Sequence, residues 1–397
     1  MFLFGLLALL AMVYGYSSWR LLGPVQLSLT GQIVAWTGVF LLLSMVPGLF
    51  FLKDRIAGKR WGDILSWITY LNLGFATLTF GLVAFRDLLW AGIFLLTHLY
   101  AVLLPGANDF HISAILSLGP GELLRYSNLA VLGLALVLCI WGYYQARRKP
   151  RVTSVSVPID SLPQALDGFR IVQFSDVHAG PTIKRPQVQA IVDQIEKLAA
   201  DLITCTGDLA DRTVSQLADD VAPLAQLKAP HGCFFVTGNH EYYAGAEAWI
   251  EALKKLGFEV LLNQHRILEH GDGRILLAGV TDFNAGEILP HHTSDPGTAI
   301  AQAPPAQVRI LLAHQPRSID AAVKAGFDLQ LSGHTHGGQF PPWKYIVTLQ
   351  QPYLKGLHKR ARTWVYINRG AGYWGPPLRL GAPAEIALIT LKKAGEN

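Results

Sequence analysis

The sequence predicts a layered α/β domain that follows an apolar membrane region of several helices. The chain is 51% hydrophobic and only 15% charged, which is too apolar for an ordinary soluble protein of 397 residues. The charge is also uneven, because only twelve charged residues precede Gln145. From Arg151 onward, short strand-like runs alternate with stretches of helical periodicity. We therefore expect two domains, a transmembrane region over residues 1–148 and a globular domain over 152–397.

The first region contains five apolar runs, several of them near the roughly 20 residues that a helix needs to cross a bilayer. They are Phe2–Leu22, Gln32–Leu52, Leu65–Phe85, Leu88–Leu104 and Asn128–Tyr144. Trp and Tyr gather near their ends, as is typical of the headgroup level. Phe2–Tyr16 is also compatible with a signal-peptide core, although it lacks a charged start and a clear small-residue cleavage site. We expect about four to five membrane helices.

Basic residues suggest how these helices are oriented. Lys and Arg cluster at 53–60 and again at 147–151, and such clusters favour the cytoplasmic side of a membrane. For both clusters to lie on the same side of the membrane, the chain must cross the membrane an odd number of times between residues 61 and 106. The last apolar run then provides one more crossing, which brings the chain back. The apolar runs give two crossings in that interval, so the cytoplasmic orientation and the helix count conflict.

The second region alternates strands and helices. Helix Gln187–Leu198 places Val188, Ile191, Val192 and Ile195 on one face. Further helices are predicted at Ser215–Leu227 and Ala246–Leu256, and strands at Phe169–Phe174, Leu202–Cys205, Cys233–Val236, Arg274–Ala278, Arg309–Ala313, Leu329–Leu331, Val365–Asn368 and Ile386–Leu391. Pro150 and Pro158 are expected to break up the segment after the basic cluster.

Five of the predicted strands end in polar residues of the metal-ligand type. The residues that follow them are Asp176 and His178, Asp208, Asn239 and His240, His314, and His334 and His336. Loops at the carboxyl ends of strands are where open α/β sheets place their chemistry. Each pattern alone is a weak signal, since a Gly-Asp pair is usually a turn and a lone His is usually structural. Their recurrence at five strand ends predicts one functional site.

The residue types indicate a metal centre. Carboxylate, amide and imidazole groups bind hard-to-borderline divalent ions, and the absence of a Cys-x-x-Cys spacing argues against a structural zinc site. Seven such ligands are too many for one ion and suit two ions that share a carboxylate. Two ions of this kind clamp a phosphoryl group and make hydroxide available near neutral pH. His240 remains free to donate a proton to the leaving oxygen.

These residues resemble the signature of the calcineurin-like metallophosphoesterases. The likeness rests on Asp176-x-His178, Gly207-Asp208-x-x-Asp211-Arg212, Gly238-Asn239-His240-Glu241, His314 and Gly333-His334-x-His336. Around Arg369, Arg379 and Glu385 the sequence is similar to the membrane-anchored bacterial branch and to transmembrane proteins with a metallophosphoesterase domain. The resemblance covers residues 152–392, and none of its metal-binding positions departs from the pattern.

The resemblance implies an αββα two-sheet sandwich with a dinuclear metal site. One ion would be held by Asp176, His178, Asp208 and His336, and the other by Asp208, Asn239, His314 and His334, with Asp208 bridging. His240 matches the catalytic histidine. We expect Mn²⁺, with Zn²⁺, Fe or Ni²⁺ as alternatives.

The expected activity is hydrolysis of a phosphoester or pyrophosphate at the inner membrane of a bacterium. A UDP-2,3-diacylglucosamine-type pyrophosphatase of lipid A synthesis is the leading specific hypothesis, because related enzymes perform that reaction. Two alternatives stay open: a phosphodiesterase of soluble substrates, and a non-enzymatic membrane sensor or scaffold. Sparse intramembrane charge gives transport little support, and no unbroken basic face indicates a nucleic-acid partner.

A last pattern follows the His334-x-His336 ligands. Residues 340–360 interleave aromatic and basic side chains, which suits the bilayer interface. On one reading they form the wall of a groove for an acylated substrate, with Trp343, Lys344 and Tyr345 in contact with it. On the other they are a hairpin whose rings pack on the sandwich.

Overall fold

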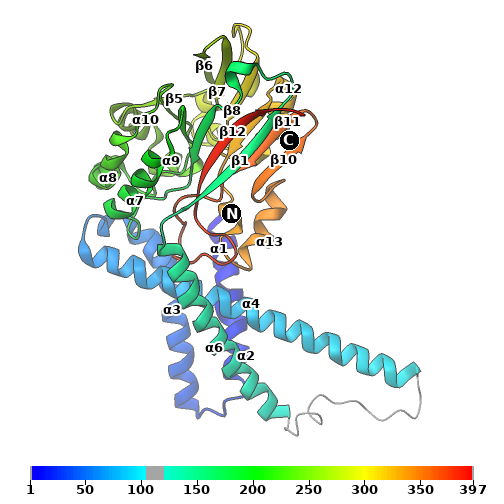
Figure 1. The fold of residues 1–397 in the computed structure, drawn as a ribbon. Coiled ribbons are helices and arrows are strands. Elements are labelled where there is room, and N and C mark those ends of the chain that lie inside the picture. The colour runs from blue at the N-terminus through cyan, green and yellow to red at the C-terminus, as the bar shows by residue number, and fades with distance from the viewer. Residues whose placement is uncertain (1, 104–119, 396–397) are drawn as a thin grey trace. The chain divides into compact units, whose positions relative to one another are not determined.

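The computed structural model describes residues 2–103 and 120–395, which form two compact units, Met1–Tyr143 and Tyr144–Asn397 (Figure 1). Leu104, the last residue of the fourth predicted apolar run, and the two C-terminal residues lie outside the described part. The helix α6 (Pro120–Arg147) contributes to both units, since its last turn belongs to the second.

The first unit is helical. Its N-terminal run is continuous in helical backbone, as α1 (Phe2–Ala11), the π-helical η1 (Met12–Tyr16) and α2 (Ser17–Leu22). It is followed by α3 (Leu29–Ile56) and α4 (Arg60–Leu103). Among the described residues, three helical segments are long and apolar enough to cross a membrane, namely Leu29–Leu52, Arg60–Tyr100 and Gly121–Arg147.

The prediction of separate helices at Leu65–Phe85 and Leu88–Leu104 is wrong, because both belong to α4. The charged pair between them, Arg86 and Asp87, does not interrupt the helix. Asp87 instead accepts a hydrogen bond at 2.6 Å from Nε of Arg20, and Arg86 donates to Asn128 of α6. With 44 residues, α4 is about 66 Å long, roughly twice the thickness of a hydrocarbon core.

The second unit contains two six-stranded sheets. The first has the order β1-β12-β2-β3-β4-β5 and the second β10-β11-β9-β8-β7-β6. The strands are β1 (Arg151–Ile159), β2 (Arg170–Phe174), β3 (Leu202–Cys205), β4 (Cys233–Phe235), β5 (Phe258–Val260), β6 (Gln264–His270), β7 (Gly273–Gly279), β8 (Val308–Leu312), β9 (Leu329–Ser332), β10 (Gly356–Arg360), β11 (Thr363–Ile367) and β12 (Glu385–Lys393).

Alternating side chains build the layers, because successive residues of a strand point to opposite faces. In β2, Ile171 joins the core between the sheets, whereas Val172 packs under the helices α7 (Arg185–Ile195), α8 (Val214–Val221) and α10 (Ala246–Lys255). In β7, Leu277 faces the first sheet and Leu276 packs with the helix α12 (Ile319–Ala325). The unit is therefore the expected αββα sandwich.

Strand direction fixes where the functional edge lies. β2, β3 and β4 run parallel to one another, and so do β7, β8, β9 and β11. Their carboxyl ends therefore meet at one edge of each sheet. β12 is antiparallel to β2 and parallel to β1, so β1 begins at the edge where β2 ends.

The eight predicted strands are all present, but β1, β5, β6 and β10 were not predicted. β1 contains Pro158, which we expected to break the segment. Proline is tolerated there because β1 is an edge strand with β12 as its sole neighbour, so no ladder needs a donor from that residue. The three cysteines are free thiols, and Cys205 and Cys233 are buried in strands.

Candidate metal centre

The structure brings the predicted ligand residues of five strand ends together. Asp176 and His178 follow β2, Asp208 follows β3, and His314 follows β8. The remaining residues are Asn239 and His240, at the start of the helix α9 (Asn239–Ala244) after β4, and His334 and His336 after β9. Asp176 and Asp208 are 0% and 2% exposed. Two carboxyl groups buried this deeply require positive partners.

A first group of donor atoms consists of Asp176, His178 and His336. His336 Nε2 lies 3.5 Å from Asp176 Oδ1 and 3.0 Å from Nε2 of His178. The other ring nitrogen of His178, Nδ1, donates to Asp211 Oδ1 at 2.7 Å. That bond leaves Nε2 of His178 with its lone pair directed at the group, as a metal ligand requires.

A second group consists of Asp208, His314 and His334. His314 Nε2 lies 3.2 Å from Asp208 Oδ2 and 3.2 Å from Nδ1 of His334. His314 is oriented by the carbonyl of Thr206, to which its Nδ1 donates at 2.7 Å. Burial and the nearby charge of His314 lower the pKa of His334 to about 3, so this imidazole is neutral and available as a ligand.

Asp208 stands between the two groups. Its Oδ2 atom, 3.2 Å from His314 of the second group, is also 3.7 Å from Nε2 of His178 in the first. Burial alone would raise the pKa of Asp208, but the charges of His314 and His240 hold it well below its usual value. An ionised carboxylate in this position suits a ligand shared by two cations.

Asn239 supplies a further donor. Its Oδ1 atom is buried and accepts no hydrogen bond within the described part of the chain. A buried carbonyl oxygen without a partner is costly and rare in native proteins. Together with three carboxylate and imidazole donors on each side, this orphaned oxygen fits two divalent cations, and the residues present match what such ions need.

The backbone at the ligands is strained. Asp176, His178, Asp208, His334 and His336 have φ angles of 52°, 52°, 54°, 71° and 52°. Non-glycine residues avoid this left-handed region, at a cost on the order of 1 kcal/mol each. Strain repeated at five ligand positions indicates that the fold holds them in place before any ion arrives.

Two glycines permit the close approach of these loops. A Cβ atom on Gly238 would lie 2.2 Å from Asp208 Oδ1, and one on Gly333 would lie 2.3 Å from Asp176 Oδ2. Neither contact is sterically allowed, so only glycine fits beside each carboxylate. This explains why both metal loops begin with glycine, a pattern visible in the sequence.

His240 forms a third group of donor atoms with His178 of the first group and Asp208 of the second. Its Nδ1 donates to Asp211 Oδ1 at 2.8 Å, and its Nε2 is 4.0 Å from Asp208 Oδ2. Burial would lower the pKa of His240, but the charges of Asp208 and Asp211 outweigh it and raise the pKa to about 9. The ring is therefore protonated near neutral pH and can donate a proton from Nε2.

Three further residues support the site although the sequence analysis assigned them no role. Asp211 accepts from both His178 and His240. Glu241 accepts from the backbone N–H groups of Asp208, Leu209 and Gly238, which ties two metal loops together. Arg379 is 1% exposed and donates to the carbonyls of Arg369, Gly372 and Ala382. All three appeared in the family signature, which was the available signal.

Trp343, Lys344 and Tyr345 begin the helix α13 (Trp343–Gln350), so the hairpin expected there is absent. They lie beside the metal loop, because a Cβ atom on Gly338 would come within 2.6 Å of the Lys344 Cα. The groove lined by residues 340–360 stays a prediction, and its last residues lie in β10 (Gly356–Arg360). β10 runs away from the site edge, and its last residue, Arg360, pairs with Thr363 at the far edge.

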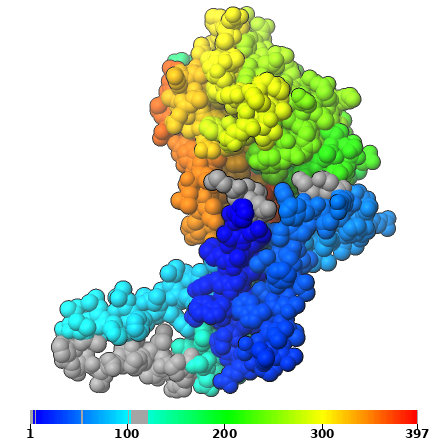
Figure 2. Space-filling view, turned by 180° about the vertical axis from the view of Figure 1, so that it is seen from behind, coloured from blue at the N-terminus to red at the C-terminus, as the bar shows by residue number. Residues whose placement is uncertain are grey.

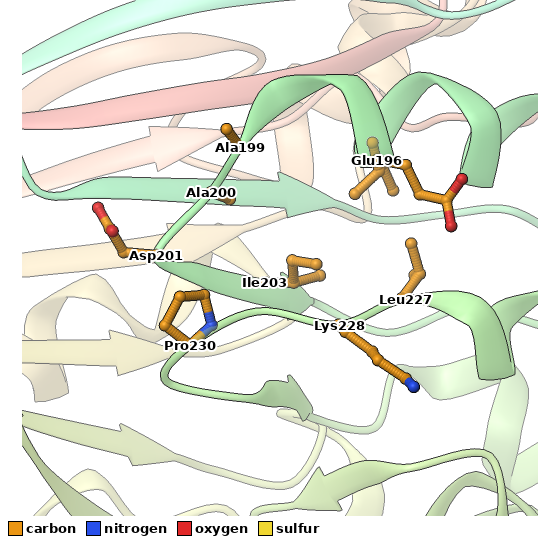
Figure 3. Close-up of a pocket in the computed structure, with 9 residues that line it drawn as sticks. Glu196, Ala199, Ala200, Asp201, Ile203, Leu227, Lys228 and Pro230 are labelled. Atoms are coloured by element: carbon orange, nitrogen blue, oxygen red, sulfur yellow. The ribbon is translucent and has the colours of Figure 1, made fainter.

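A cavity of about 280 Å³ lies elsewhere in the unit (Figure 3). Its lining includes Glu196 after the end of α7, Asp201 just before β3 and Lys228. Asp208 follows the opposite end of that strand. This cavity is therefore separate from the metal centre.

Comparison with known proteins agrees with this geometry. Residues 169–338 match the calcineurin-like phosphoesterase family. The chain is 38% identical over 278 residues to a transmembrane protein with metallophosphoesterase domain from Danio rerio, a match covering 68% of this chain and 63% of that protein. The chain thus spans less than two thirds of that relative.

Two further comparisons extend this result. An uncharacterized metallophosphoesterase from Campylobacter jejuni is 30% identical over 363 residues, which cover 91% of this chain and 90% of that protein. Among solved structures, a 5'-nucleotidase precursor from Thermus thermophilus is 17% identical, with a TM-score of 0.36 and coverage of 56% of this chain and 54% of that one. From the sequence relatives and its own ligand geometry, the chain belongs to the calcineurin-like metallophosphoesterases.

Proposed function

We propose that the protein is a membrane-anchored hydrolase that cleaves phosphoric esters or pyrophosphates with two divalent metal ions at the bilayer surface. The chemistry follows from the paired donor groups around Asp208. The location follows from one structural observation, the short path along the sheet edge from the end of α6 to Asp176.

That path consists of backbone hydrogen bonds. Arg151, the first residue of β1, pairs with Glu385, whose N–H donates to the carbonyl of Gly370 at 2.9 Å. The next residue, Ala371, donates to the carbonyl of Ser175 at 2.8 Å, and Asp176 follows. Three strand spacings, about 15 Å, therefore separate the start of β1 from a metal ligand.

The last turn of α6 is fixed to the same edge. Ala146 packs in the core under the first sheet. Arg147 donates to the carbonyl of Thr182 at 2.9 Å and to the hydroxyl of Tyr373 at 3.2 Å. Only three residues then lead into β1. Because α6 is apolar enough to cross a membrane, this short connection supports a metal centre that works close to the bilayer.

The residues of the site have different roles in the proposed reaction. Asp176, His178, Asp208 and His336 would hold one ion, and Asp208, Asn239, His314 and His334 the other. Two divalent ions held there supply positive charge to the phosphoryl group and lower the pKa of an attacking water. His240 donates its Nε2 proton to the leaving oxygen, and Asp211 keeps the ring in the correct tautomer and orientation. We propose Mn²⁺ as the physiological metal.

The substrate that fits this position is a phosphoester or pyrophosphate attached to a lipid. Acylated substrates reside in the bilayer, and Trp343, Lys344 and Tyr345 form the first turn of α13, in which Lys344 packs against Gly338 of the metal loop. Lys344 Nζ stacks 4.7 Å from the ring of Tyr345, so a cation and an apolar ring are presented together. A UDP-2,3-diacylglucosamine-type pyrophosphate has both the anionic and the acylated part that such a surface would bind.

We also propose that the catalytic unit faces the cytoplasm of a bacterial cell. α4 counts as one crossing and α6 as a second, so the basic residues at 147–151 return to the side of those at 53–60. The conflict found with five separate apolar runs is removed, because two of the runs are a single helix.

A substrate screen tests the proposal. The full-length protein in lipid nanodiscs with Mn²⁺ is given an aryl phosphodiester, a UDP-diacylglucosamine and phospholipids, and phosphate ester cleavage is measured. We expect preference for acylated substrate by at least tenfold in kcat/KM. Equal cleavage of soluble nucleotide diesters would favour a soluble-substrate phosphodiesterase. Metal binding without cleavage of any substrate would favour a sensor or scaffold.

A further inference from the structure

α13 exposes an apolar face. Tyr345, Ile346 and Leu349 are 62%, 37% and 86% exposed. Leu349 follows Tyr345 by four residues and Ile346 by three, and residues at these two spacings are neighbours on a helix surface, so Leu349 joins the three side chains into one patch. Apart from Tyr144 in α6, the other exposed large apolar residues described in this unit come singly from separate segments, namely Val152, Tyr243, Phe283, Ile288 and Trp374. Single exposed residues are normal, whereas a helix face of this kind marks a contact surface.

The helix cannot fold back to bury this face, because it is held firmly at both ends. Lys344 packs against Gly338 of the metal loop. Gln351, just after the helix, is buried and donates from Nε2 to Gln315 Oε1 at 3.1 Å. The returning segment is held by Thr335, whose hydroxyl donates to the carbonyl of Leu354 at 2.6 Å. The apolar face is therefore a fixed part of the surface of the catalytic unit, to which the orange atoms of Figure 2 also belong.

The strand directions show at which edge of the catalytic unit α13 lies. α13 connects the end of β9 to the start of β10, which is antiparallel to the neighbouring β11. Both of those strand ends are at the edge that carries the metal centre. Arg151, where the chain leaves α6, lies at this edge as well. Figure 1 shows α13 and the first residues of β1 at the same end of the catalytic unit.

We propose that α13 docks into the bilayer surface, with Ile346 and Leu349 inserted at the boundary between headgroups and acyl chains. The occupant of the face is lipid because the edge that presents it also carries the end of α6, a helix able to cross a membrane. Lys344 and the exposed Lys355 flank the face, and such cations gain about 1 kcal/mol each near anionic lipid. The inference needs α6 in a membrane and is independent of the substrate.

Fluorescence quenching tests this contact in the full-length protein. In a Cys139→Ala background, where the remaining cysteines are buried, Leu349→Cys is labelled with an environment-sensitive dye and reconstituted in nanodiscs. Asp272→Cys, in the exposed β6–β7 turn at the far edge, is the matched control. We expect nitroxide lipids to quench the label at residue 349 at least threefold more strongly than the label at residue 272.

Three other outcomes overturn the proposal. Equal quenching at the two positions removes any special role of α13. The dye at residue 349 could instead be shielded from water without being quenched by nitroxide lipids. If that shielding disappears when the labelled protein is diluted with unlabelled protein, the face is covered by a second copy of the chain. Finally, Leu349→Glu should lower quenching at a label on Ile346→Cys while cleavage of a soluble aryl phosphodiester changes less than twofold. Unchanged quenching in that variant also rejects insertion.

Discussion

Asp211 Oδ1 lies 2.8 Å from Nδ1 of His240, the residue that would protonate the leaving group. The same oxygen accepts from His178 on the opposite loop, so a single carboxylate orients a metal ligand and an acid. The two rings stand nearly perpendicular, with centroids 4.5 Å apart. Asp211 therefore couples the orientation of a metal ligand to that of the proton donor.

Substitution of Asp208 and of His240 should therefore have different effects. Asp208→Asn is expected to weaken both ions, because its carboxylate reaches both groups of donors. His240→Ala should retain the metal and lose about 10²–10⁴-fold in turnover, the usual effect of removing a general acid. Elemental analysis of the purified variants, with kcat measured in parallel, checks this. A near-zero metal content in His240→Ala would make His240 a ligand.

Asp211→Asn should act through His240. Because the charge of Asp211 raises the pKa of His240, its removal lowers that pKa. An acid is active when protonated, so the basic limb of the pH profile of kcat/KM should move to lower pH. Loss of such a supporting carboxylate typically costs about 10–100-fold. An unshifted profile with reduced activity would leave Asp211 a purely structural role.

The aromatic start of α13 predicts a substrate-dependent effect. Trp343→Ala combined with Tyr345→Ala should raise KM for an acylated phosphoester while sparing a soluble aryl phosphodiester. The reason is that the metal ligands and His240 stay intact while apolar contact area beside the metal loop is removed. KM values for both substrates in nanodiscs decide the matter. Equal losses on both substrates, or none on either, would contradict the proposed role.

Membrane topology can be tested in cells. A reporter that is active only in the periplasm, fused after Asn397, should give no signal if the catalytic unit is cytoplasmic. A second fusion inserted in the loop between α2 and α3 serves as the positive control, since one crossing separates it from residues 53–60. A strong signal at the C-terminus would place the catalytic unit outside the cytoplasm and contradict the proposed orientation.

Most of the metal centre could be predicted because its pieces are local. A short apolar strand, a glycine and then Asp or His can be recognised in a few residues, as at Gly207-Asp208 and Gly333-His334. The inter-sheet core follows from the same strands. The sequence gives little indication of a side chain's role when that role depends on a contact with a residue distant in the chain. Asp211 is three residues from Asp208, but its role depends on His178 and His240, which come from two other loops.

The errors have similar causes. Arg86 and Asp87 looked like a break between two helices, because their partners, Arg20 and Asn128, lie in other helices. β1 and β10 are edge strands with many polar residues, so they lack the continuous apolar run of an interior strand. α13 directly follows the metal loop, and its apolar residues were compatible with a hairpin strand. The structure instead places them in a helix, with three of them exposed on one face.

The three-residue connection between α6 and β1 has a kinetic consequence. Ala146 packs in the core of the catalytic unit and Arg147 donates to Thr182, so the end of α6 is itself part of that unit. An enzyme held in this way searches for its substrate in two dimensions, by lateral diffusion. Its rate would then depend on the mole fraction of substrate in the surrounding lipid, and diluting that lipid at constant bulk concentration would slow it.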